Sequence, residues 1–266
     1  MNPLILIRGG GDLASGVALR LHRVGFQVAI LELDKPLAVR RTVSFSEAVY
    51  EGSQTVEGVT ARLISADQFQ VTLEAGEIPV LIDPHANILN NQFLTSPTST
   101  FVVDARLMKT EPEPLPERVA LHIGLGPGFT AGANCHAVIE TMRGHALGRV
   151  YWDGQTAPDS RQPDGDTRRV LRAPAAGTLQ PNKAIGAFCK EGETLAFVSG
   201  KPVISPFDGI LRGLIHPKVE LTEGMKIGDV DARNEPSMVR FVSDKALSVA
   251  GGVLEAVYVK LREMEG

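Results

Sequence analysis

The first 34 residues constrain the fold more than any other part of the chain. They contain a buried apolar strand over residues 4–7, three consecutive glycines, an amphipathic helix that starts near residue 12, and a second strand over residues 27–33. An apolar run without polar alternation is typical of a strand covered on both faces of a parallel sheet, and apolar residues at helical spacing indicate the helix. The pattern predicts a βαβ unit of a Rossmann-like α/β domain.

The glycine turn is a candidate anion-binding loop. It carries Gly9-x-Gly11-x-x-Ala14 rather than a full three-glycine fingerprint, so it predicts the fold more strongly than it predicts a bound dinucleotide. Amides at a helix start attract phosphate, and dinucleotide-binding units place an acid about 20 residues later against a ribose. Glycines that only shape the turn, and arginines that are only solvated, are the alternatives. The candidate cofactor-binding residues here are Gly9, Gly10, Gly11, Asp12, Glu32, Arg40 and Arg41, with Asp34 close to Glu32.

Composition excludes several classes of partner. The chain has 266 residues, of which 27 are basic and 31 acidic, and a pI near 5.9, so its charge does not favour nucleic acid or an anionic membrane. No apolar run approaches the roughly 20 residues of a membrane span, and no basic and apolar leader precedes the first strand. Cys135 and Cys189 lack metal-binding spacing and are expected to be free thiols. We expect a cytoplasmic protein without a metal site; a homo-oligomer stays open.

Three further strands are expected, over residues 61–64, 79–82 and 101–103. The last two end in Asp83 and Asp104, and acids beyond the carboxyl ends of parallel strands are candidates for a binding or catalytic site. Asp is also common in turns, and this interpretation is favoured for Asp83. Basic residues follow Asp104 closely, so we expect it to lie in a pocket of mixed charge.

A second glycine loop spans residues 124–132, after a strand expected over 119–123 and before a helix expected over 133–142. This order repeats the anion-binding arrangement of the first loop, so the two loops would hold the two ends of one ligand. The alternative is that both loops are only turns. The candidate binding residues of this loop are Gly124, Gly126, Gly128 and Thr130.

Cys135 would lie at the start of the expected helix, where the helix dipole lowers the pKa of a thiol. A reactive or sulfur-carrying thiol is one interpretation, and a small core residue is the favoured one. His136 and Glu140 would share a face of that helix, but two ligands are too few for a metal ion.

A stretch rich in Pro, Gly and Asp, residues 153–168, predicts an exposed linker. An internal repeat follows it. Residues 173–179 recur as residues 205–211, and the segment that starts at Cys189 recurs at Leu221, both at an offset of 32. Each half reads as short strands between glycine turns, so one unit has been duplicated.

The repeat resembles the biotinyl and lipoyl carrier domains over residues 170–231, which implies a small all-β barrel-sandwich. Those domains carry their modified lysine in a hairpin between the halves. The corresponding turn, residues 199–202, is shorter here, so we expect Lys201 to be unmodified and the module to be structural or a docking surface.

The predicted organisation has four parts. Residues 1–152 form the Rossmann-like cofactor-binding domain, residues 153–168 the linker, residues 169–232 the barrel-sandwich, and residues 233–266 a helical segment that packs back on the first domain. Two glycines interrupt the expected C-terminal helix, and close packing against another backbone would explain them.

The most distinctive segments are IRGGGDLASGVALRLHRVGF, LELDKPLAVRRTVSFSEAVYEG, IGLGPGFTAG and VIETMRGHALGRV. Together with the repeat, they resemble the selenium-dependent molybdenum hydroxylase system protein family over nearly the whole chain. The resemblance implies an accessory role in maturing molybdenum hydroxylases of the xanthine dehydrogenase type, with a molybdopterin-type cofactor as the ligand. It does not imply a settled reaction, and the sequence shows no selenocysteine.

Three functions compete on this basis. The leading one is an accessory protein that holds a phosphorylated pterin or nucleotide between the glycine loops and serves a client molybdenum hydroxylase. The second is an NAD(P)-dependent oxidoreductase, which Glu32 and Asp34 favour although no evident catalytic set is present. The third is a non-enzymatic scaffold that docks a client hydroxylase. Whether the chain is an enzyme stays open; Asp104 and Cys135 are the catalytic candidates.

Overall fold

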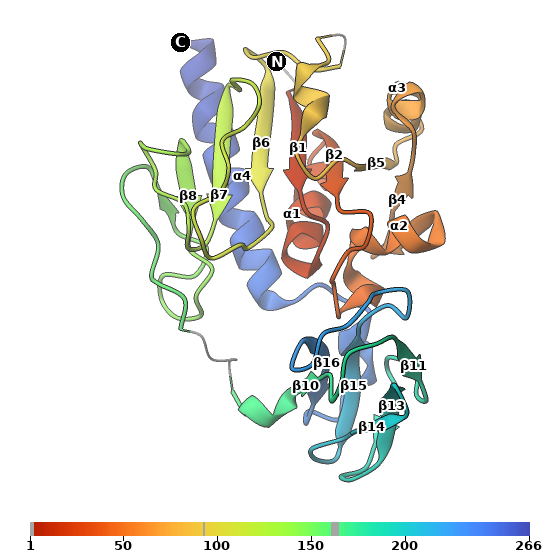
Figure 1. The fold of residues 1–266 in the computed structure, drawn as a ribbon. Coiled ribbons are helices and arrows are strands. Elements are labelled where there is room, and N and C mark those ends of the chain that lie inside the picture. The colour runs from red at the N-terminus through yellow and green to blue at the C-terminus, as the bar shows by residue number, and fades with distance from the viewer. Residues whose placement is uncertain (1–2, 93, 161–164) are drawn as a thin grey trace.

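The computed structural model describes residues 3–92, 94–160 and 165–266. It has a large α/β body and a smaller body of β-sheets, and the two lie one above the other in Figure 1. The predicted strand, glycine turn, helix and strand at the N-terminus are confirmed. They are β1 (Leu4–Arg8), α1 (Asp12–Arg23) and β2 (Gln27–Glu32).

Within the described residues, the large sheet has nine strands in the order β3-β4-β5-β2-β1-β6-β7-β8-β9. Neighbours from β4 to β8 are parallel, but β3 and β9 pair antiparallel at the two edges. The strands not yet given are β3 (Ser53–Val56), β4 (Val59–Leu63), β5 (Ile78–Ile82), β6 (Thr100–Asp104), β7 (Leu121–Leu125), β8 (Ala137–Ile139) and β9 (Val150–Tyr151).

The predicted fold class, a parallel Rossmann-like sheet, is therefore wrong: the sheet is mixed. One cause is the two-residue turn between β3 and β4. Glu57 and Gly58 both have positive φ, of 47° and 84°, and such a turn reverses the chain into an antiparallel hairpin.

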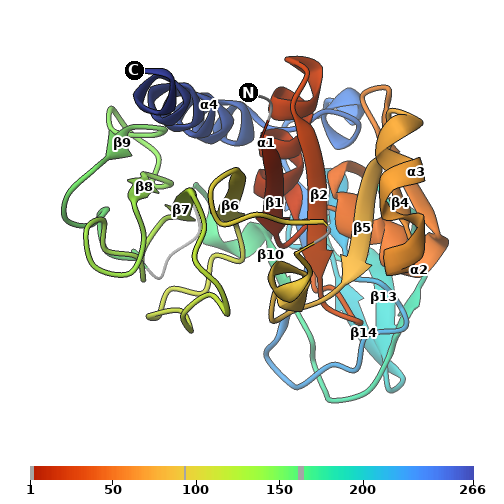
Figure 2. The same ribbon diagram turned by 90° about the horizontal axis from the view of Figure 1, so that it is seen from above.

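Two helices cover one face of the sheet, α1 and the long C-terminal α4 (Asp244–Glu265), which run side by side in Figure 2. Gly16 permits this close approach of the two helices, and Gly252 permits α4 to pack on the segment between β8 and β9. A Cβ atom on Gly16 would lie 2.7 Å from Cβ of Ala246, and one on Gly252 would lie 2.1 Å from the carbonyl oxygen of Gly148. The opposite face packs on α3 (Phe69–Glu74) and the 3-10 turn η4 (Asn87–Asn90).

Three short segments connect β2 to β3: the 3-10 turns η1 (Arg41–Val43) and η2 (Phe45–Glu47), and α2 (Ala48–Glu51). Another 3-10 turn, η3 (Ala66–Gln68), leads into α3. None of the helices in the described ranges combines the length and the apolar character that crossing a membrane requires.

The helix expected over residues 133–142 is absent from the described structure, which has strand β8 there. Residues 137–139 are fully buried and pair with β7 on one side and β9 on the other. A tight turn precedes the strand, in which the side chain of Asn134 accepts the amide of Thr130. The apolar run was thus a short buried strand, which periodicity alone does not separate from a helix.

The smaller body consists of a four-stranded and a three-stranded antiparallel sheet, in the orders β10-β16-β15-β12 and β11-β13-β14 among the described residues. One apolar cluster fills the space between them. This pair of sheets does not specifically show the predicted biotinyl/lipoyl-like barrel, and that part of the fold prediction is wrong. The strands are β10 (Val170–Arg172), β11 (Leu179–Pro181), β12 (Phe188–Cys189), β13 (Thr194–Val198), β14 (Lys201–Ile204), β15 (Gly209–Leu214) and β16 (Lys226–Asp231).

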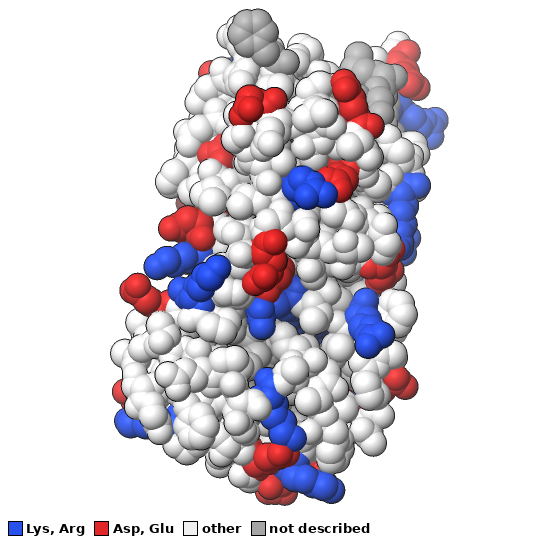
Figure 3. All heavy atoms as spheres, turned by 90° about the vertical axis from the view of Figure 1, so that its right-hand side faces the viewer, with Lys and Arg blue, Asp and Glu red and all other residues white. Residues whose placement is uncertain are grey.

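The chain joins the two bodies in both directions. The 3-10 turn η5 (Thr167–Arg169) precedes β10, and η6 (Pro236–Val239) connects β16 to α4. Both glycine loops leave the carboxyl ends of parallel strands, β1 and β7, so they lie at the same edge of the large sheet. The surface in Figure 3 intersperses acidic and basic side chains and shows no broad area of one sign on that face.

Candidate ligand-binding site

The first glycine loop uses its amides within the protein. The amide of Gly9 donates to the carbonyl oxygen of Leu31 (2.7 Å), and the amide of Gly10 donates to Oε1 of Glu32 (2.6 Å). The other carboxylate oxygen of Glu32 accepts the amide of Leu33 (2.7 Å). Burial raises the pKa of Glu32. The acid expected to hold a ribose thus binds the glycine loop itself, where a phosphate would otherwise approach.

Arg40 and Arg41 connect segments of the chain. Arg40 is buried and reaches Oδ2 of Asp12 (3.1 Å) and the carbonyl oxygens of Met238 and Phe241. Arg41 donates to the carbonyl oxygen of Leu214 (2.8 Å) and pairs with Glu47. The structure therefore gives both arginines a role in joining the two bodies, and Arg40 also lines the cleft described below.

Asp104 is fully buried in a network of four charges. It pairs with Arg8 (3.1 Å) and Arg106 (2.6 Å), and both arginines also reach Oε1 of Glu113 at 2.6 Å. Burial opposes ionisation of Glu113, but hydrogen bonds from Arg106 and Arg8 outweigh it and lower its pKa to about 2. The charge around Asp104 is mixed, as expected, but this residue does not line either cavity of the cleft described below.

The second glycine loop is closely packed. A Cβ on Gly124 would lie 2.1 Å from the ring of Phe129, and one on Gly128 would lie 2.3 Å from the carbonyl oxygen of Thr110. The amide of Gly126 donates to the carbonyl oxygen of Ile139 (3.0 Å). The hydroxyl of Thr130 accepts a hydrogen bond from the side chain of Gln155 (2.7 Å). Close packing accounts for these glycines without a ligand.

Cys135 and His122 are buried near this loop. Burial raises the pKa of Cys135 to about 11, so no helix dipole activates the thiol, contrary to the expectation for a helix start. Burial also lowers the pKa of His122 to about 4. Its Nε2 has no hydrogen-bond partner among the described residues, and its ring meets Phe129 edge to face.

The main cleft lies between the carboxyl edge of the large sheet and the smaller body. It consists of two adjoining cavities of about 640 and 440 Å3. Gly11 and the first turn of α1 line the larger cavity, and Pro127 of the second glycine loop lines the smaller. The residues shared by both cavities are Leu13, Leu107, Arg143, Arg169, Lys226 and Lys245.

Charged side chains dominate the cleft, and basic ones are in excess. Among the described residues that line the two cavities, nine are basic and seven acidic. The basic ones are Arg40, Lys109, Arg143, Arg169, Arg172, Arg212, Lys226, Arg233 and Lys245. The acidic ones are Asp12, Glu140, Asp159, Asp166, Asp229, Asp231 and Asp244.

The acids of β16 and α4 form ion pairs with arginines. Asp229 pairs with Arg169 (2.7 Å), and Asp231 accepts both ends of the Arg233 guanidinium (2.9 and 2.7 Å). This hydrogen bonding lowers the pKa of Asp231. Arg143 forms a two-pronged pair with Asp244 (2.8 and 2.9 Å) and lowers the pKa of that carboxylate.

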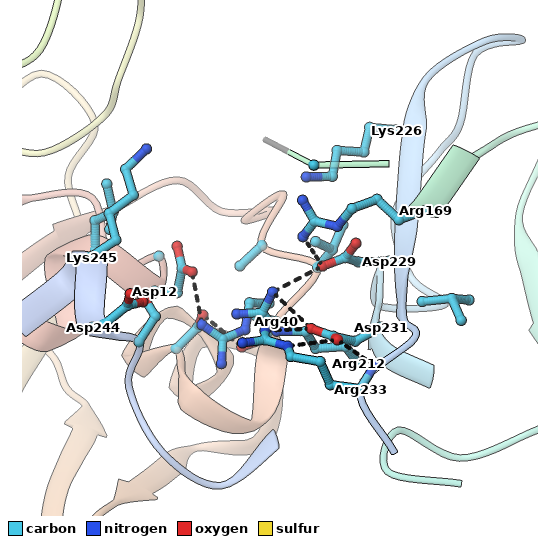
Figure 4. Close-up of a pocket in the computed structure, with 18 of the residues that line it drawn as sticks. Asp12, Arg40, Arg169, Arg212, Lys226, Asp229, Asp231, Arg233, Asp244 and Lys245 are labelled. Atoms are coloured by element: carbon cyan, nitrogen blue, oxygen red, sulfur yellow. Dashed lines mark hydrogen bonds and ion pairs between the residues drawn. The ribbon is translucent and has the colours of Figure 1, made fainter. Parts of the chain in front are cut away.

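Two lysines in the cleft remain unpaired. Lys226 begins β16 and Lys245 lies in the first turn of α4, and the side chain of neither has a hydrogen bond or ion pair with any described residue. In Figure 4 they extend from opposite walls, with Arg169 beside Lys226. The cleft therefore holds two lysine ammonium groups that form no ion pair with an acid of the described chain.

A cluster that the sequence analysis missed lies at the junction of the two bodies. Ligand atoms of Glu47, Glu51 and His216 fall within 4.8 Å of one another. However, Arg41 already pairs with Glu47, and Nδ1 of His216 accepts the amide of Lys218 (3.2 Å). That hydrogen bond places the imidazole proton on Nε2, which faces Glu51 at 3.4 Å. The contacts fit a link between the bodies better than a metal site.

Most basic residues of the cleft were also not predicted from the sequence. Arg212 and Lys226 belong to strands read only as halves of a repeat. One signal was available: the strand 226–231 places acids among apolar residues that the structure buries, and buried charges require partners. The positions of those partners, in η5, β15 and α4, are not visible in the local sequence.

No protein-family model matches the chain. The chain is 45% identical over 268 residues to the Uncharacterized protein YqeB of Escherichia coli (strain K12), covering 98% of this chain and 48% of that protein. The chain thus spans about half the length of the curated relative it matches.

Among solved structures, a succinylglutamate desuccinylase/aspartoacylase from Rhodobacter sphaeroides is 15% identical over 88% of this chain and 87% of its own, with a TM-score of 0.28. An aspartoacylase family protein from Mesorhizobium loti is 9% identical over 86% and 85%, with a TM-score of 0.25. The ectoine utilization protein EutE (DoeB) from Ruegeria pomeroyi is 11% identical over 86% of both chains, with a TM-score of 0.26. These low scores establish no activity for this chain.

These comparisons contradict the resemblance to the selenium-dependent molybdenum hydroxylase system proteins. No family model matches the chain and the curated relative is uncharacterized, so nothing among the comparisons points to that family. The predicted function, an accessory protein for molybdenum hydroxylases that binds a pterin or nucleotide at the glycine loops, is therefore wrong. Its alternatives, the NAD(P)-dependent oxidoreductase and the hydroxylase scaffold, also lack support.

Proposed function

We propose that this protein binds a small phosphorylated molecule in the cleft between its two bodies. The observation that carries the proposal is the pair of unneutralised ammonium groups, Lys226 and Lys245, on opposite walls of a cavity large enough for a small molecule. Arginines from other segments surround them, so a bound oxyanion would receive several charge-assisted hydrogen bonds.

Phosphate fits this site better than a singly charged group. A phosphate ester carries a charge near −2 at neutral pH, which matches two unpaired lysines. The first turn of α1 and the first turn of α4 also line the larger cavity, and helix N-termini favour anions. Gly11, Asp12 and Arg40 would then lie at the edge of the ligand site, while Gly9, Gly10 and Glu32 support the loop behind it.

Calorimetric titration with inorganic diphosphate tests this proposal. We expect the unaltered protein to bind it, and the double variant Lys226→Gln/Lys245→Gln to bind at least about a hundredfold more weakly, because each of the two lost charge-assisted contacts costs about 1.5 to 3 kcal/mol. Raising the salt concentration should weaken binding to the unaltered protein. Lys260→Gln is the matched control, since Lys260 lies on the same helix as Lys245 and pairs with Glu263. Equal affinities for all three proteins would contradict the proposal.

We further propose that the protein resides in the cytoplasm. Cys135 and Cys189 are both free and buried, which suits a reducing compartment. Fractionation of cells that make the protein, probed with an antibody against it, tests the location; recovery in another compartment would contradict it.

A further inference from the structure

Lys226 differs from the other lysines whose interactions the structure describes. Lys183, Lys190 and Lys260, for example, each pair with an acid. Lys226 lines both cavities of the cleft and has an accessible side chain with no hydrogen bond or ion pair among the described residues. Its amine therefore faces the space that a ligand would occupy, and no side-chain partner among the described residues has to be displaced.

The surroundings of this amine lower its pKa, so it loses its proton more easily than an ordinary lysine does. Arg169 and Arg212 lie close by on η5 and β15, while Asp229 on its own strand and Asp12 on α1 oppose their effect. Enclosure by the protein, together with the arginines, outweighs these acids and lowers the pKa of Lys226. A lysine that is partly shielded from water and lies beside other cations is activated as a nucleophile, because its amine loses the proton more easily.

We propose that Lys226 forms an imine with a small aldehyde or ketone that carries a phosphate group. This inference rests on the proposed function, because the same cleft must first hold the phosphate. Lys245 and the cleft arginines would bind the phosphate, and the bound ligand would then hold its carbonyl carbon close to Nζ of Lys226.

The step balances without an oxidant or a reductant. The neutral Nζ adds to the carbonyl carbon, and a proton moves from nitrogen to oxygen to give a carbinolamine. Loss of water from the carbinolamine then forms the carbon–nitrogen double bond. Water returns by the same route when the imine hydrolyses.

Reductive trapping of the whole chain tests this inference. The probe is pyridoxal 5′-phosphate, an aldehyde with a phosphate group, and pyridoxal is its matched control without the phosphate. Borohydride reduces any imine to a stable secondary amine, and peptide mass spectrometry locates it. We expect label at Lys226 about tenfold faster than at Lys201, which is exposed outside the cleft, and a clear preference of Lys226 for the phosphorylated aldehyde.

Two variants complete the test. Lys226→Arg keeps the charge but lacks the amine, and should remove the fast-labelling site. Lys201→Arg should leave that site unchanged. Labelling spread evenly over the lysines, or a fast site that persists in Lys226→Arg, would overturn the inference. If the unaltered protein binds diphosphate but shows no preferential labelling of Lys226, the imine alone is overturned. If the unaltered protein does not bind diphosphate either, the proposed function is overturned as well.

Discussion

The carboxyl edge of the large sheet and the cleft beside it both gather charged groups, but they satisfy them differently. At the sheet edge, the amide of Gly10 is taken by Glu32, and the carboxylate of Asp104 is taken by Arg8 and Arg106. In the cleft, the side chains of Lys226 and Lys245 have no hydrogen bond or ion pair with any residue that the structure describes. Polar groups that pair with one another build a fold, and binding requires groups that remain available. We therefore expect a ligand to bind in the cleft and not at the glycine motif.

The largest expected effect is on stability, and it distinguishes Gly10 from Gly11 in the first glycine loop. A Cβ on Gly10 would lie 2.8 Å from the backbone nitrogen of Ser46, whereas one on Gly11 would meet nothing within 4 Å. We expect Gly10→Ala to lower the free energy of unfolding by about 3 kcal/mol through overpacking, and Gly11→Ala to lower it by less than about 1 kcal/mol. Urea unfolding of both variants checks this. Equal losses would show that close packing does not determine the role of Gly10.

The next effect is the pH dependence of stability that the buried imidazole of His122 produces. His122 titrates near 6.5 in the unfolded chain but near 4 in the folded one, so the unfolded state binds more protons between these values. Stability should therefore fall as pH falls from 6.5 to 4, by roughly 2 to 3 kcal/mol from this group. His122→Phe should remove that part of the pH dependence, because Nε2 has no partner to lose among the described residues. Denaturation series at several pH values provide the measurement; identical pH profiles for both proteins would contradict the buried neutral imidazole.

A smaller effect tests whether Glu32 serves the loop or a ligand. Glu32→Ala leaves the amides of Gly10 and Leu33 without their acceptor and should cost about 1 to 2 kcal/mol of stability. Glu32→Gln retains a side-chain oxygen that can accept, and it removes a charge whose burial is unfavourable, so it should cost under about 1 kcal/mol. Diphosphate titration of Glu32→Gln is the second measurement. A large loss of affinity in that variant would move the ligand back to the glycine loop.

The sequence predicted local structure better than the arrangement of the sheets. The strand, turn and helix over residues 4–34 were readable because their signals lie within a few residues of one another. The turn assigned to Asp83 is confirmed, since its carboxylate accepts the amides of Asn87 and Ile88. The antiparallel edges and β8 were missed, because short buried strands have no periodicity of their own.

The candidate site shows the same division. Gly11, Asp12 and Arg40 were named from the sequence and do line the cleft. The two unpaired lysines, Lys226 and Lys245, were not named from the sequence, because they lie far along the chain from the glycine motif and no local pattern connects them. Whether a charged side chain is paired is decided by residues brought near it in the fold, and the sequence of one chain does not display that pairing.

The most direct measurement is a crystal structure of the protein grown with inorganic diphosphate. Our account predicts the anion between Lys226 and Lys245, in contact with the cleft arginines, while Glu32 stays hydrogen-bonded to the amide of Gly10. An anion seated on the amides of the first glycine loop, with Glu32 displaced, would contradict the account.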